Sequence, residues 1–100
     1  MLIFIRKIGG APSKLYVSVP TKFVRLFKLK KGEVVEVKLR KIIKNNDKVT
    51  YSEDIPFLAK VISHKNHTIV IIPQDVAKIF NLTKGDNVEV KIKLIERVLS

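Results

Sequence analysis

The chain has 100 residues, enough for one compact domain, and 46% of them are hydrophobic, which argues against disorder. It contains no cysteine, which excludes disulfides and thiolate chemistry, and its longest apolar runs, such as Ile69–Ile72, are too short to span a bilayer. Twenty Lys and Arg against nine Asp and Glu give a net charge of +11, a field that attracts polyanions such as nucleic acid.

The positive charge is uneven along the chain, with a net +9 in residues 1–53 and +2 in residues 54–100. Lys-rich surfaces also occur for solubility, but +11 exceeds the magnitude of about 2–8 that serves that purpose in a small domain. Apolar Leu2–Ile5 precede Arg6 and Lys7, the reverse of the order in a secretory signal. We therefore expect a cytoplasmic chain that makes no membrane contact.

The first elements in chain order are two strands and a short helix. We expect strands over Leu2–Ile8 and Leu15–Val19, joined by the polar loop Gly9–Lys14. The second strand stops at Pro20, which cannot donate to a sheet but suits the first turn of a helix. The helix is expected to end near Leu29.

The helix and the strand after it have different periodicities. Phe23, Leu26 and Phe27 share one face at helical spacing, so we expect that face to be buried. Gly32 allows the positive φ of a tight turn. The final strand alternates in the period of a half-buried sheet, with Val35, Val37 and Leu39 inward and Glu36 and Lys38 outward.

An internal repeat organises the whole chain. Shifting the sequence by 53 residues sets Leu15–Leu39 over Thr68–Ile92 without a gap, and ten of these 25 positions are identical. Pro20 over Pro73 and Gly32 over Gly85 are among them. The second copy then has a first strand, a loop, a second strand and a final strand at Phe57–Ile62, Ser63–His67, Thr68–Ile72 and Val88–Ile92.

One unit of this size buries too little surface to fold alone, so the two copies must share a core. We therefore predict a single domain, residues 1–100, with copies at residues 1–44 and 57–100 and a linker at residues 45–56. Val49–Tyr51 could add a short strand within the linker. The predicted fold is mainly β with two short helices, a duplicated β-β-α-β unit related by an approximate two-fold axis.

These runs resemble the AbrB/MazE/SpoVT family of swapped-hairpin DNA-binding domains. That family has a strand with a basic pair, a loop, a strand ending in Ile-Pro, a helix, Leu-x-x-Gly-Asp and a Val-rich strand. The matching runs are Phe4–Ile8, Val17–Pro20, Leu29–Glu33 and Val35–Val37, and in the second copy Phe57–Val61, Val70–Pro73, Leu82–Asp86 and Val88–Val90. Because such domains normally pair as homodimers, the resemblance implies a dimer fused into one polypeptide, an intrachain pseudo-dimer.

The resemblance implies a protein that binds double-stranded DNA without a cofactor, as a transcriptional regulator or a nucleoid-associated protein. By position, its DNA contacts would be Arg6, Lys7, Lys14, Lys22 and Arg25 in the first copy and Lys60, Lys65, His67 and Lys78 in the second. Lys22 and Arg25 also lie three residues apart, opposite the apolar face of the helix, so we expect them to be exposed together. Pairing of two such chains into a homodimer stays open.

The two copies differ from the family and from each other. The arginine that the family has four residues before the proline is replaced by Tyr16 and Ile69, and both preceding loops are longer than the family's turn. Lys22 of the first copy becomes Asp75 in the second. We therefore predict that the first copy dominates DNA affinity.

Two other classes of function compete with DNA binding. The same duplicated unit builds double-psi barrels, some of them enzyme cores, but the two histidines here, His64 and His67, lack the acidic partners of a triad or a metal site. We expect no enzyme and no bound metal. The other class is a protein-interaction or substrate-binding β-barrel module without DNA binding. An antitoxin would need an acidic tail, which Lys93–Ser100 does not provide.

Overall fold

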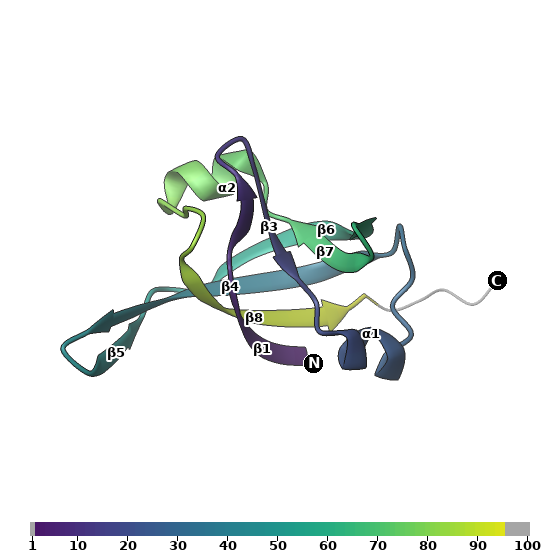
Figure 1. Cartoon of the computed structure of the whole chain (residues 1–100), viewed down its shortest axis with the longest axis horizontal. Coiled ribbons are helices and arrows are strands. Elements are labelled where there is room, and N and C mark those ends of the chain that lie inside the picture. The colour runs from purple at the N-terminus through teal and green to yellow at the C-terminus, as the bar shows by residue number, and fades with distance from the viewer. Residues whose placement is uncertain (1, 96–100) are drawn as a thin grey trace.

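The computed structural model of the chain describes residues 2–95, apart from the side chain of Asn45. Met1 and residues 96–100, the end of the predicted second copy, lie outside this range. The described chain forms one antiparallel sheet that curls into a half-barrel and carries two short helices (Figure 1). The elements are β1 (Leu2–Lys7), β2 (Gly9–Ala11), β3 (Lys14–Ser18), α1 (Thr21–Leu26), β4 (Val34–Asn45), β5 (Lys48–Tyr51), β6 (Ile55–His64), β7 (His67–Ile71), α2 (Gln74–Ile79) and β8 (Asn87–Leu94).

The strand order of the sheet is β1-β8-β4-β6-β7-β3-β2, and β5 pairs with β4 beside this path. β1 and β2 stand at opposite ends of this strand order, yet only Ile8 separates them in the chain. The sheet therefore curls until its two edge strands lie close together. β6 spans two neighbours by itself, because its first part pairs with β4 and its part from Val61 onward pairs with β7. The predicted fold class, mainly β with two short helices, is confirmed.

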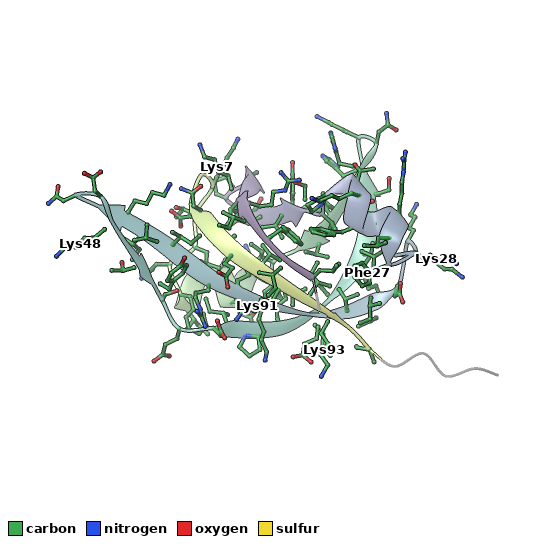
Figure 2. All side chains as sticks on the ribbon, turned by 90° about the horizontal axis from the view of Figure 1, so that it is seen from below. Lys7, Phe27, Lys28, Lys48, Lys91 and Lys93 are labelled. Atoms are coloured by element: carbon green, nitrogen blue, oxygen red, sulfur yellow. The ribbon has the colours of Figure 1, made fainter. Side chains whose placement is uncertain are left out.

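Both helices follow a proline and run for six residues. The expected apolar face is wrong at Leu26, which is 71% exposed. The matching face expected in the second copy, Val76, Ile79 and Phe80, is wrong at Ile79 and Phe80, which are 71% and 42% exposed. Only one side of so short a helix packs against the core. In α1 this side consists of Phe23, Val24 and, just after the helix, Phe27. Phe27 points toward the sheet and Lys28 away from it (Figure 2). Neither helix has the length or the apolar character to cross a membrane, as far as the described residues go.

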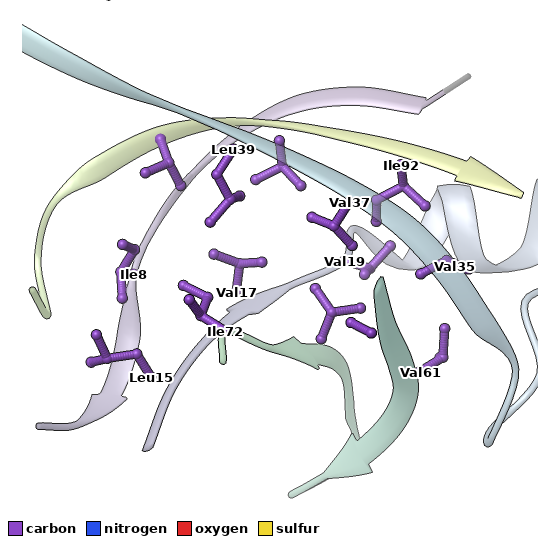
Figure 3. Close-up of a cluster of buried hydrophobic side chains, with 14 of the residues drawn as sticks. Ile8, Leu15, Val17, Val19, Val35, Val37, Leu39, Val61, Ile72 and Ile92 are labelled. Carbon is purple, nitrogen blue, oxygen red and sulfur yellow. The ribbon is translucent and has the colours of Figure 1, made fainter. Parts of the chain in front are cut away.

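The interior of the half-barrel is filled by alternate residues of the strands. Val35, Val37 and Leu39 of β4 are fully buried, as the alternation predicted, and so are Val88 and Val90 of β8. Figure 3 shows side chains from both halves of the chain pointing into this one interior. Each such side chain contributes about 1.5–3 kcal/mol when fully buried, so the shared core is the main source of stability.

The predicted polar loops are largely strand. Gly9–Ala11, expected in a loop, forms β2 and pairs with β3. In the second half, His64 pairs with His67 across a two-residue turn, Lys65-Asn66, with φ of 47° and 66°. Positive φ at both central residues is typical of a type I′ turn, whose twist matches the flanking strands. The turn was missed because Lys-Asn stands where Asn-Gly would have signalled it.

The predicted linker is mostly a β-hairpin. β4 continues past its expected end at Leu39 as far as Asn45, and the chain turns back at Asn46-Asp47 into β5. This hairpin projects from the body of the protein (Figure 1). The short extra strand expected at Val49–Tyr51 is confirmed.

Two glycine turns tie the helices to distant strands. Gly32 and Gly85 have φ of 88° and 94°, a region that disfavours residues with a Cβ. The amide of Gly32 donates to the carbonyl of Val61 at 2.7 Å, and that of Gly85 donates to the carbonyl of Ile8 at 2.8 Å. The Gly32 turn is thereby fixed against β6, and the Gly85 turn against Ile8 between β1 and β2, in each case in the other half of the chain.

Candidate nucleic-acid interface

Ion pairs hold four of the cations of β4 and β8. Arg40 Nε lies 2.7 Å from Asp54 Oδ1, and Lys91 Nζ lies 3.8 Å from the other oxygen of that carboxylate. Lys91 also pairs with Glu89 on its own strand. Two further pairs, Lys38 with Glu36 and Lys41 with Asp86, again take their cations from β4. Four of the cations on these two strands are therefore paired, whereas Lys44 and Lys93 have no ion pair among the described residues.

The Arg40–Asp54 pair also shifts the pKa of both of its groups. The hydrogen bond from the Arg40 guanidinium is the main reason that the pKa of Asp54 lies below its ordinary value. The same hydrogen bond raises the pKa of Arg40. Both groups keep their charges at neutral pH and are partly solvated, so the pair adds little to stability.

The nine residues predicted to bind DNA form no side-chain ion pair with any residue of the described range. Eight of them are exposed, and Arg6 is half-buried. Figure 2 shows Lys7 on the side of the molecule opposite Lys91 and Lys93. The nine residues lie on β1 (Arg6, Lys7), β3 (Lys14), α1 (Lys22, Arg25), β6 (Lys60), the β6–β7 turn (Lys65), β7 (His67) and α2 (Lys78).

Arg6 is set into the gap between β1 and β3. Arg6 follows the same alternation as buried Leu2 of β1 and buried Ile8 just after the strand. The residue of β6 that matches Arg6 under the 53-residue shift is the buried Ala59. Its Nε is buried and has no hydrogen-bond partner within the described structure. The side chain lines a hollow of about 390 Å³ together with Ile5, Lys7, Ser18 and Asn87. The Arg6 guanidinium therefore lines a hollow from which its remaining N–H groups can donate hydrogen bonds to an anion.

A second hollow, of about 460 Å³, brings Lys14 and Lys65 together. Its other lining residues, Lys84 and His64 among them, were not predicted as site residues. Lys84 belongs to the Lys-Gly turn before β8, and nothing in the local sequence indicated that this turn would reach the β6–β7 turn. The sheet pairing places both turns at the rim of this hollow.

The other predicted residues lie apart from these two hollows. Lys78 lines a third hollow, with Asn81 and Thr83 at the end of α2. Lys22 and Arg25 are both exposed on α1, as predicted, and Lys22 Nζ lies 5.2 Å from the centroid of the Phe23 ring. The described structure therefore distributes the nine residues over several groups and does not gather them into one cluster.

No three His, Asp or Glu side chains of the described residues come close enough to hold a metal ion. Comparison with known proteins adds no relative, because no family model, no curated protein and no solved structure matches this chain.

Proposed function

We propose that this chain binds duplex DNA in the cytoplasm, as an AbrB-like transcriptional regulator or nucleoid-associated protein. The observation that carries the proposal is the distribution of ion pairs: they occupy Lys38, Arg40, Lys41 and Lys91 of β4 and β8, whereas none of the nine predicted residues forms one among residues 2–95. Phosphate groups require long cationic side chains without competing carboxylates, which these positions supply.

The architecture that we propose with it is a swapped-hairpin, or cradle-loop, barrel made of two β-β-α-β repeats. In its support, β1 pairs with β8 of the other half and β6 pairs with β4 of the first half. The amide of Val19 donates to Thr68 at 2.8 Å, and the amide of Ile72 donates to Leu15 at 2.9 Å. These two bonds exchange under the 53-residue shift, as expected for a pseudo-two-fold axis.

Three double variants, each removing two positive charges, test the proposal. The first is Lys7→Gln with Arg25→Gln, and the second is the pair at the matching positions, Lys60→Gln with Lys78→Gln. The control is Lys38→Gln with Lys93→Gln, on β4 and β8, where none of the nine predicted residues lies. Because the net charge falls by two in all three variants, any difference in their DNA affinity reflects where the removed charges lie on the protein.

The measurement is the fluorescence anisotropy of a short labelled duplex over a range of salt concentrations. If about four to six phosphates are contacted, log K of the wild type falls against log salt with a slope of about −4 to −5. The first double should reduce this slope by about two units, the second by less, and the control hardly at all. Equal losses in all three would contradict the proposed face. Absence of binding at low salt would contradict DNA binding and favour an interaction module.

A further inference from the structure

The hollow of about 460 Å³ has the composition of a ligand site rather than of a simple phosphate contact. Its volume falls within the range of about 300–1,000 Å³ that is usual for small-molecule sites. Tyr16, Ile62 and Ile69 give it an apolar part, and exposed Lys14, Lys65 and Lys84 surround that part, with no acidic residue in the described lining. Such a lining suits a flat apolar group that carries a negative charge.

Ile69 is a buried apolar residue in the lining of this hollow. It is 2% exposed, yet it does not belong to the cluster that fills the half-barrel. Its neighbours on either side along β7 differ in environment: Val70 packs into that core, whereas Thr68 is half-buried. Ile69 therefore forms a separate apolar spot on the outer side of β7.

Two aromatic rings lie beside this spot, and the backbone holds one of them in place. Tyr16 pairs across the strands with Gly9, where an added Cβ would stand only 3.2 Å from the Tyr16 ring. At Gly10, which has a φ of 105°, an added Cβ would stand 2.2 Å from the carbonyl oxygen of Lys14. The two glycines thus let β2 lie flat against the tyrosine. The His64 ring lies 5.6 Å from the Tyr16 ring, centroid to centroid, at an angle of 53°.

We propose that this hollow binds an unstacked nucleobase together with its phosphate. The base would lie against Tyr16 and Ile69, and the phosphate would be held by the surrounding lysines, because aromatic faces stack on any base and lysines attract the backbone charge. The base and phosphate could belong to a single strand or to a free nucleotide. This inference goes beyond duplex binding and does not depend on it, since the bases of a duplex are stacked and paired.

The chain allows a matched test, because it has one tyrosine in the hollow and another, Tyr51, exposed on the β4–β5 hairpin. Deoxyadenosine monophosphate is titrated into wild type, Tyr16→Leu, Tyr51→Leu and Lys84→Gln by calorimetry, with ring signals of Tyr16 and His64 followed by NMR. We expect Tyr16→Leu to weaken binding about fivefold or more, from lost stacking. Lys84→Gln should weaken it without loss of fold, and Tyr51→Leu should have no effect.

Deoxyadenosine and inorganic phosphate, each titrated alone, separate the two parts of the ligand. Both should bind more weakly than the nucleotide, and phosphate should not move the Tyr16 ring signals. A single-stranded tetranucleotide that binds more tightly than the mononucleotide assigns the ligand to a strand, and the reverse order assigns it to a free nucleotide. Equal effects of Tyr16→Leu and Tyr51→Leu, or no response to Lys84→Gln, would overturn the inference. Duplex affinity is measured on the same variants, so failure of duplex binding can be told apart from failure of this site.

Discussion

The two halves of this protein have nearly the same backbone around the helices and very different side chains on it. Pro20 and Pro73, which precede the helices, have φ of −55° and −56°, and the residues Lys28 and Asn81 after them have φ of 50° and 52°. Yet Lys22 in α1 corresponds to Asp75 in α2, and Arg6 in β1 corresponds to Ala59 in β6. A few prolines, glycines and inward valines suffice to determine the backbone, which leaves the exposed positions free to concentrate positive charge in one half.

The largest expected effect tests whether both halves depend on one interior. Leu39 and Ile92 occupy matching positions in β4 and β8, and both are buried. Leu39→Ala and Ile92→Ala should each lower the free energy of unfolding by about 2–5 kcal/mol. Urea unfolding followed by circular dichroism should show a single transition in both variants. A second transition, or a loss confined to one of the two variants, would mean that the halves have separate cores.

A charge exchange tests the difference between the halves at its clearest position. Lys22→Asp gives α1 the residue of α2, and Asp75→Lys does the reverse. We expect the first to weaken duplex binding and to reduce the salt slope by about one unit, and the second to strengthen binding. Anisotropy titrations at several salt concentrations measure both changes. If both variants changed duplex affinity in the same direction, α1 and α2 would not contact the DNA in equivalent ways.

The smallest expected effect concerns the ion pair between Arg40 of β4 and Asp54. Arg40→Gln removes the hydrogen bond that lowers the pKa of Asp54, so that pKa should rise toward its ordinary value of 3.8. Because the folded pKa is lowered, the pair stabilises the protein above that ordinary value, and the contribution is lost as pH falls through the lowered pKa. Carboxyl carbon NMR titration measures the shift. Lys93→Gln serves as the control and should leave the Asp54 titration unchanged.

Much of the fold could be predicted from the sequence because local patterns determine it. The alternation in Val35–Leu39, the prolines before the helices and the glycine turns all correspond to elements of the structure. The loops could not be predicted as well, since residues such as Lys65 and Asn66 adopt positive φ without a glycine to signal it. The exposure of Leu26 was missed because helical spacing does not reveal which side of a short helix meets the core.

The candidate site was harder to predict than the fold. Lysines could be nominated one by one, but their grouping depends on pairings between distant strands, such as those that bring Lys84 close to Lys14. The partial burial of Arg6 could be anticipated from its place in the alternation of β1, between inward Leu2 and Ile8. The hollow beside Tyr16 has no local signature, because its apolar floor and its lysines come from separate segments of the chain.

The shared interior has a consequence for how the protein behaves when it is scarce. Residues of both halves, such as Val37 and Val90, pack in one cluster within a single polypeptide. Assembly of that cluster is therefore unimolecular, and dilution cannot separate the halves as it separates the subunits of a dimer. The two halves also stay covalently joined, so they cannot exchange partners with other molecules as the subunits of a dimer can.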